Sequence, residues 1–462
     1  MSVLDILEPI YKKLPEVKAP EVAPPLKKRL IWSGLALILF FVLGHITVLG
    51  LSASSEGALT NLQVILASKI GSLVTAGIGP VVLASIILQL LVGGKIINID
   101  LTNPKDKARF SGLQKLFAII LCFFEAGVFA VSGMLVPNQG MLVPVILQVA
   151  LGSIILLYLD EVVSKYGIGS GIGLFIAGGV SETIFWRIFG PVTPETLIAP
   201  GILWQFIESL STGVDFLILL PIISTLIVFF VVVYAEGMHV NIPITMGRKG
   251  TGGRFPVKLL YVSNIPVILA VALFANIQLW SMIVPDWAID IPDITIPLIN
   301  FSILEIGLKS FLQGIADLVT APYGLIITMA YGGFNLGLLL HGIAYLIILV
   351  GVCVVFGKFW VDMGGQGPEA VSNQLSNSGM YIPGFRRDPR IIRGILNRYI
   401  PPITILGSAF VGLLAGLADF TSALGSGTGI LLTVGIVYRL YEELAKQQLM
   451  ETNPLMKKLF GG

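Results

Sequence analysis

The chain has 462 residues, of which 55% are hydrophobic and only 12% are charged, and its mean hydropathy is +0.90. A water-soluble core cannot bury that much apolar surface, so the composition excludes a soluble globular protein and predicts an integral membrane protein. The two cysteines, Cys122 and Cys353, both lie in apolar segments, which excludes a disulfide framework and a cysteine metal cluster.

The first 30 residues carry five prolines, four of them between residues 15 and 25, and six basic residues. Leu4, Leu7, Ile10 and Leu14 follow helical spacing in the opening stretch. This pattern predicts an amphipathic segment, residues 1–30, that lies on the membrane surface and is not a cleaved signal peptide.

Apolar stretches of about 20 residues predict membrane-spanning helices. The chain has ten of them, so we expect an all-α protein that crosses the membrane ten times. The predicted spans are about 31–51, 71–92, 113–134, 141–159, 168–186, 214–234, 257–281, 336–356, 399–418 and 427–443.

Two further segments are less clear. Residues 58–67, before the second span, begin polar and become apolar, which fits either a short helix folded into the outer mouth or a plain extracellular loop. Residues 295–333 are apolar but interrupted by charges, Pro322 and paired glycines, and we interpret them as outer-face or partly re-entrant structure.

Lysine and arginine set the expected orientation. If the N-terminus is cytoplasmic and the spans alternate, every basic residue except Lys69, Arg187 and Lys309 falls on the cytoplasmic side or at a helix end on that side. This asymmetry follows the positive-inside rule and places both termini in the cytoplasm.

Two pairs of segments indicate an internal inverted repeat. "IGPVVLA" at residues 78–84 resembles "NIPVILA" at 264–270, and "GSGIGLFIA" at 169–177 resembles "GSGTGILLT" at 425–433. These pairs fall in spans 2 and 7 and in spans 5 and 10, and within each pair the spans run in opposite directions. Spans 1–5 and 6–10 therefore form two predicted halves, with the functional path at their interface.

The repeated motifs present aliphatic side chains where ion and solute transporters usually present charges. A ring of such side chains can exclude water and ions by dewetting and can close around bulky, varied cargo, with glycines allowing close helix approach. Ordinary helix packing is the alternative interpretation. The residues concerned are Ile78, Val82, Ile172, Ile176, Ile268 and Leu432.

Four long motifs identify a family: "GIGPVVLASIILQLLVGGKII", "LDEVVSKYGIGSGIGLFIAGGV", "YVSNIPVILAVALFANIQLW" and "LGSGTGILLTVGIVYRLYEE". They resemble the SecY and eukaryotic Sec-alpha family, especially its archaeal members, over nearly the whole chain. The resemblance implies the central subunit of a protein-conducting channel, with two five-helix halves around an hourglass pore.

The resemblance also implies site residues. A hydrophobic pore ring of the family matches the six aliphatic residues named above, and a plug helix matches roughly residues 58–69. The plug residues are Ala58, Leu59, Thr60, Asn61, Leu62, Gln63, Val64, Ile65, Leu66 and Ala67.

Members of the family open sideways between spans 2 and 3 of one half and 7 and 8 of the other, which implies a lateral gate here. An apolar signal segment partitions into lipid through such a gate, while hydrophilic chain stays in the pore. Asn264 and Glu125 match gate positions, but a third position that is polar in relatives is Leu83 here. For Glu125, a protonated packing carboxyl and a proton-coupled transport site remain as alternatives.

Two basic loops, residues 237–256 and 358–398, are longer than the topology needs. Their charges suit the phosphates of ribosomal RNA, with salt-sensitive binding, although the positive-inside rule alone is another explanation. The resemblance likewise implies docking of the ribosome or of a motor protein. The candidate docking residues are Arg248, Lys249, Arg254, Lys258, Arg386, Arg387, Arg390 and Arg393.

Motifs of catalysis are missing from the sequence, which has no nucleotide-binding lysine loop and no HExxH, and whose three histidines are scattered. We therefore expect no enzyme activity, no cofactor and no metal. A secondary transporter with inverted repeats and Glu125 as its coupling site is the competing function.

These observations divide the chain into expected parts. The partners that the resemblance implies are a SecE-type gamma subunit, a small beta subunit, the ribosome, polypeptides bearing a signal sequence, and membrane lipid, in the cell membrane. The parts are the N-terminal segment 1–30, an N-terminal half 31–188, an external linker 189–213, a C-terminal half 214–443 and a cytoplasmic tail 444–462.

Overall fold

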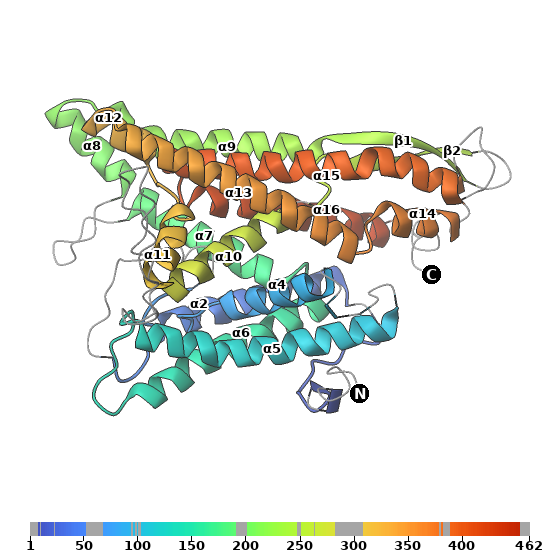
Figure 1. The fold of residues 1–462 in the computed structure, drawn as a ribbon, viewed down its shortest axis with the longest axis horizontal. Coiled ribbons are helices and arrows are strands. Elements are labelled where there is room, and N and C mark those ends of the chain that lie inside the picture. The colour runs from blue at the N-terminus through green and yellow to red at the C-terminus, as the bar shows by residue number, and fades with distance from the viewer. Residues whose placement is uncertain are drawn as a thin grey trace, which may run out of the picture.

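Each of the ten predicted spans contains an apolar helix in the part of the chain that the structure, a computed structural model, describes (Figure 1). The helices are α2 (Leu26–His45), α4 (Gly79–Gly93), α5 (Pro104–Val131), α6 (Leu142–Tyr166), α7 (Gly171–Phe189), η1 (Phe216–Leu219) followed by α9 (Leu220–Gly237), α10 (Ile265–Ser281), α13 (Leu336–Met363), α15 (Pro389–Phe420) and α16 (Gly427–Thr452).

The description omits residues 1–7, 10, 23, 52–67, 94–95, 98, 100–102, 191–200, 247–250, 263, 282–307, 378–379, 382–388 and 453–462. Among the described residues, six helices are long and apolar enough to cross a membrane by length and composition, and α4 and α10 are apolar but shorter. The predicted all-α, multi-pass architecture is confirmed.

The two halves form two layers. In Figure 1 the N-terminal helices α2, α4, α5 and α6 lie below, and the C-terminal helices α9, α13, α15 and α16 lie above, with α7 and α10 between them. Helix contacts follow the same division, because α5 packs on α4 and α6, whereas α15 packs on α13 and α16. The interface between the layers is therefore built mainly by α4, α7, α10 and α16.

The structure supports the inverted repeat at the level of single residues. Helices α4 and α10 each begin one residue before the matched prolines, Pro80 and Pro266. Before α7 and α16, the matched glycines Gly169 and Gly425 have φ angles of 70° and 71°, a left-handed conformation that glycine adopts without strain. The same turn chemistry thus starts corresponding helices in the two halves.

Local capping explains where several helices begin. The Asn103 side chain accepts from the Lys105 amide at 3.1 Å and precedes Pro104 at the first position of α5, and Asn335 caps α13 through the Leu338 amide at 3.2 Å. These caps satisfy amides that the helix itself leaves unpaired.

Short helices cover the end of the bundle at which α7 ends. They are α8 (Ile202–Thr212), α11 (Leu308–Leu318) and α12 (Leu325–Gly332); Figure 1 shows α8 and α12 at the upper left and α11 below them, beside α10. The last two lie in the region that we interpreted as outer-face structure, and neither is long enough to span a membrane. Residues 282–307 lie outside the described part.

The opposite end carries a small sheet. Strands β1 (His239–Met246) and β2 (Thr251–Lys258) pair as an antiparallel hairpin, and β3 (Met380–Tyr381) adds to β1, giving the order β2-β1-β3. Helix α14 (Pro368–Asn377) lies beside β3. The two predicted loops are therefore joined through Thr245 and Tyr381 into one structure.

Helix α15 begins ten residues earlier than predicted, inside what the sequence suggested was a loop. Its first turns bury Ile392, Leu396 and Ile400, spaced four residues apart, in a cluster with Val257 and Val371. This second core fixes α15 to the hairpin and to α14.

Residues 15–18 have no regular secondary structure and lie against α5 and the last turn of α6. Lys115 Nζ donates to the Pro15 carbonyl at 2.5 Å, Tyr166 Oη donates to the Lys18 carbonyl at 2.8 Å, and Lys165 donates to the Val17 carbonyl. Three of the four residues behind the predicted amphipathic helix lie outside the described part, so that helix stays a prediction.

Candidate functional site

The six aliphatic residues of the predicted ring converge between the two layers, although they come from four helices. Ile78 immediately precedes α4, Val82 lies on α4, Ile172 and Ile176 on α7, Ile268 on α10 and Leu432 on α16. Four of them belong to one buried cluster, and Ile172 and Ile268 pack against that cluster.

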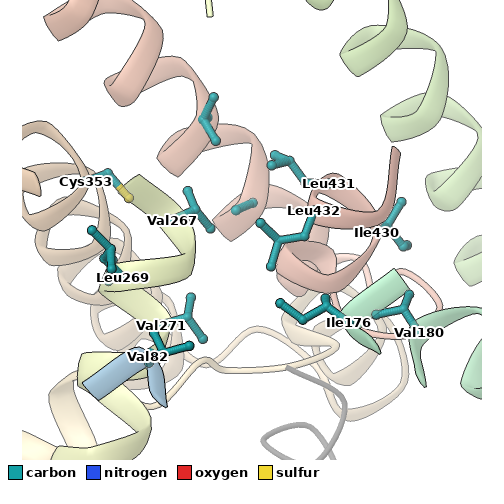
Figure 2. Close-up of a cluster of buried hydrophobic side chains, with 14 of the residues drawn as sticks. Val82, Ile176, Val180, Val267, Leu269, Val271, Cys353, Ile430, Leu431 and Leu432 are labelled. Atoms are coloured by element: carbon teal, nitrogen blue, oxygen red, sulfur yellow. The ribbon is translucent and has the colours of Figure 1, made fainter. Parts of the chain in front are cut away.

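This waist is closed in the structure. Ile78, Val82, Ile176 and Leu432 are each at most 5% exposed, whereas side chains that border an open aqueous path are in contact with solvent. Figure 2 shows Leu432 of α16 beside Ile176 of α7, and Val82 of α4 beside Val271 of α10. The arrangement can block water and ions, because it offers them no polar ligand.

On one side of the waist the halves meet at a contact that we call the α4–α10 seam, in which α4 and α5 face α10 and α13. Both α10 and α13 contact α4, and α10 also contacts α5. Its packing is apolar: Val82 and Ile86 of α4 share a cluster with Val267, Val271 and Phe274 of α10. These are the spans at which the sequence predicts a lateral gate.

Glu125 lies on α5 in this seam. Its side chain is 1% exposed, and neither carboxylate oxygen has a hydrogen-bond partner. Its neighbours on the helix, Cys122 and Ala126, share a buried cluster with Leu279 of α10. An unpartnered buried carboxyl destabilises the packing around it, so the closed seam carries a built-in cost.

Leu83 and Asn264 occupy different surroundings. Leu83 is 1% exposed on α4, next to Val82. Asn264, just before α10, donates from Nδ2 to the Leu431 carbonyl of α16 at 3.0 Å, inside the C-terminal half. The gate assignment of these two residues stays a prediction.

Asn276 was missed by the sequence reasoning. It lies on α10 one turn before Leu279, is 1% exposed, and its Oδ1 has no hydrogen-bond partner. The indole nitrogen of Trp280 is also buried without a partner. The available signal was a pair of amides, Asn276 and Gln278, within an otherwise apolar stretch, and the structure places them on the helix that contacts α5.

On the other side of the waist, α2 and α7 contact α16, and we call this contact the α7–α16 seam. Here a charged side chain joins the halves. Arg29 at the start of α2 donates from Nε to the Gly167 carbonyl at 2.7 Å and from Nη2 to Glu443 of α16 at 3.0 Å. The helices are in contact here, since a Cβ on Gly173 would lie 3.6 Å from Ile436, at ordinary van der Waals distance.

The candidate docking residues divide into several groups. Lys258 pairs with Glu442 of α16 at 2.6 Å, and Arg393 pairs with Glu369 of α14 at 3.0 Å. Arg390 is exposed at the start of α15, and Arg254 belongs to β2. Arg248, Lys249, Arg386 and Arg387 lie outside the described residues, as does the predicted plug, Ala58 to Ala67.

Each of the three histidines contacts a backbone carbonyl. His45 and His239 each contact a backbone carbonyl close in sequence, and His341 contacts the carbonyl of Asp317. Within the described part of the chain, no cluster of three or more His, Cys, Asp or Glu side chains is arranged to hold a metal ion.

Comparison with known proteins decides the family. The model of the SecY family matches residues 72–441. The chain belongs to the SecY family. It is 46% identical to the protein translocase subunit SecY of Methanococcus vannielii, covering 98% of this chain and 99% of that protein. It is 47% identical to the corresponding subunit of Methanocaldococcus jannaschii, again covering 98% and 99%.

Solved structures of the SecY family agree with this. "The structure of a protein conducting channel" matches with a TM-score of 0.79 at 46% identity, covering 96% of this chain and 98% of the other. "Sec61 in the Canine ribosome-channel complex from the endoplasmic reticulum" matches with a TM-score of 0.77 at 46% identity and the same coverage. The chain is therefore similar in fold, over nearly its full length, to protein-conducting channels.

Proposed function

We propose that this chain is the pore-forming subunit of a Sec protein-conducting channel. In this role it passes unfolded secretory polypeptides across the membrane and releases transmembrane segments sideways into lipid. The observation that carries the proposal is the convergence of Ile78, Val82, Ile172, Ile176, Ile268 and Leu432, from both halves, in one closed aliphatic waist.

An aliphatic ring suits this cargo because a translocating polypeptide presents every kind of side chain. Branched apolar groups make no specific demand on the cargo, adapt their rotamers to its width, and exclude ions around it. A transporter of one small solute would instead need polar ligands at the waist. We therefore favour the pore ring, and not proton-coupled transport at Glu125, as the basis of the function.

The α4–α10 seam is the proposed lateral gate, with Glu125, Leu83 and Asn264 assigned as predicted and Asn276 added. Its apolar packing resembles lipid in polarity, so a sufficiently apolar signal segment can replace it at little cost. Each leucine of such a segment gains about 0.3–0.6 kcal/mol on entering lipid. Polar segments lack this gain and stay in the pore.

Similarity to the family supports our proposals for the remaining parts. We propose a plug at residues 58–67 and a multi-pass position in the cell membrane with both termini cytoplasmic. We also propose association with a SecE-type gamma subunit and a small beta subunit. The parts of the chain keep the predicted limits: 1–30, 31–188, 189–213, 214–443 and 444–462.

The β1–β2 hairpin and the start of α15 form the proposed ribosome-docking surface. Its basic side chains suit RNA phosphates, and β3 and α14 hold the two segments in one unit. Because Lys258 is engaged by Glu442, we expect its substitution to weaken ribosome binding only modestly.

Crosslinking from the waist tests the proposed function. Cys122 and Cys353 are replaced, a single cysteine is placed at Ile176, and the complex is reconstituted with a ribosome-stalled secretory chain that carries one cysteine. We expect disulfides to Ile176→Cys that depend on the length of the stalled chain.

A cysteine at Ile347, which is 66% exposed on the outer side of α13, is the control. If an engaged chain never reaches position 176 and crosslinks only at such exposed positions, the assignment of the pore is wrong.

A further inference from the structure

The starts of α7 and α16 are capped by the same set of groups. Asp160, on α6, accepts from the amides of Gly171 and Ile172, the latter at 2.9 Å from Oδ1. Asp419, on α15, accepts from the amides of Gly427 and Thr428, the former at 2.7 Å from Oδ1. In each half, an aspartate from the preceding helix holds the first two amides of the last helix.

Serines complete both caps. Ser170 Oγ accepts from the third amide of α7, Gly173, at 3.4 Å, and Ser426 Oγ accepts from the third amide of α16, Gly429, at 3.0 Å. The first three amides of a helix have no partner within it. In both helices all three are satisfied, two by an aspartate and one by a serine.

Close backbone approach makes this possible. A Cβ on Gly171 would lie 2.5 Å from the Cα of Asp160, and a Cβ on Gly427 would lie 2.5 Å from the amide nitrogen of Asp419. Only glycine permits such contact between a helix start and the neighbouring helix. The two matched glycines therefore let the carboxylates reach the helix starts.

Ring residues follow the caps directly. Ile172 donates its own amide to Asp160, and Ile176 lies one turn further along α7. Leu432 lies five residues after Gly427 on α16. The position of each carboxylate thus sets how far α7 or α16 extends toward the waist and which side chains it presents there.

We propose that Asp160 and Asp419 are positioning residues of the pore ring, which hold α7 and α16 in the register that closes the waist. This inference rests on the proposed function, because it takes the ring to be the seal. Loss of either carboxylate lets its helix shift or rotate and opens the seal to ions while leaving the halves assembled.

The test measures ion leak from proteoliposomes that contain the complete reconstituted complex without cargo. Asp160→Ala and Asp419→Ala are each expected to raise the leak about two- to thirty-fold, the factor that corresponds to loss of an ordinary helix cap. Asp160→Asn and Asp419→Asn are expected to leak much less, because an amide oxygen still accepts from the helix amides. Rescue by asparagine distinguishes positioning from a general loss of structure.

Matched controls remove neighbouring contacts. Glu161→Gln alters the next residue on α6, whose carboxylate pairs with Lys115 at 2.8 Å and Lys165 at 3.0 Å. Tyr345→Phe removes the hydroxyl that donates to Asp419 Oδ2 at 3.3 Å but keeps the cap on Gly427. Neither control is expected to leak.

A direct ring variant, Ile176→Gly, separates the two claims. If it leaks while assembled alanine variants of both aspartates stay tight, the inference is overturned and the proposed ring stands. If Ile176→Gly itself stays tight, the ring and the inference both fail. If an alanine variant does not assemble, Asp160→Glu or Asp419→Glu is tested in its place. The longer side chain displaces the carboxylate by one methylene, so this variant is also expected to leak.

Discussion

The two seams between the halves differ in chemistry although both border the same waist. The α7–α16 seam is crossed by Arg29, which holds Gly167 and Glu443 at 2.7 and 3.0 Å. The α4–α10 seam is packed mainly by apolar side chains and contains Glu125, whose oxygens have no partner.

We infer from this difference that the two seams move differently. Breaking the α7–α16 seam would separate a hydrogen-bonded ion pair, whereas opening the α4–α10 seam replaces apolar contacts with lipid or signal side chains and gives a buried carboxyl access to water. The first is suited to be a pivot and the second a gate.

Locking each seam gives the largest contrast. In a background without Cys122 and Cys353, a Val82→Cys and Val271→Cys pair is placed across the α4–α10 seam and joined by a short crosslinker. A Gly173→Cys and Ile436→Cys pair is the matched control across the α7–α16 seam. We expect the first lock to abolish translocation almost completely and the second to leave most of it, as measured by protease protection of cargo.

Translocation that survives a complete lock at Val82 and Val271, or is lost equally with both locks, would contradict the assignment of gate and pivot. Reversal of each lock by cleavage of the crosslinker shows that the cysteines alone are not responsible.

Glu125→Leu is expected to have an intermediate effect. Removing the unpartnered carboxyl stabilises the closed seam by about 1–3 kcal/mol. At about 0.5 kcal/mol for each leucine, a signal segment then needs roughly two to six additional leucines to open the gate. Membrane insertion of a series of signals with increasing leucine content measures this threshold, and Glu125→Gln should fall between.

An unchanged threshold in Glu125→Leu would mean that the carboxyl imposes no cost on the closed seam. Insertion of the most apolar signal in the series is the internal control, because it should remain complete in every variant.

Charge reversal at the pivot gives the smallest effect. Arg29→Glu and Glu443→Arg each place like charges together, and the pair is partly exposed, so we expect each to lower the free energy of unfolding by about 1 kcal/mol. The double variant should recover part of the loss in a double-mutant cycle on the purified complex. Additive losses would show that the two side chains do not interact.

Much of this architecture could be predicted from the sequence, because bilayer thickness fixes the length of the apolar segments and turns at helix starts require glycine. The apolar spans locate the helices. The shared motif around Gly169 and Gly425 indicated an inverted repeat, and the structure gives these two glycines matching φ angles of 70° and 71°. The ring residues follow from these motifs, and the structure brings them together in one cluster.

Other features depend on packing that no local pattern records. Arg29 and Glu443 are 414 residues apart, and their contact exists only because α2 lies against α16. The segment that forms strand β1 was predicted as loop. Its partners, β2 and β3, lie in two different parts of the chain, and the pattern within β1 does not record that pairing. Asp160 and Asp419 precede the glycine motif in both halves, yet only the structure shows which amides they hold.

Distances across both seams during translocation test the central claim most directly. Spin labels at Ile120 of α5 and Ile347 of α13 report on the α4–α10 seam, and labels at Leu35 of α2 and Val437 of α16 report on the α7–α16 seam; all four side chains are exposed. We predict that a stalled secretory chain lengthens the first distance and leaves the second unchanged. Lengthening of the second distance, with or without the first, would contradict the account.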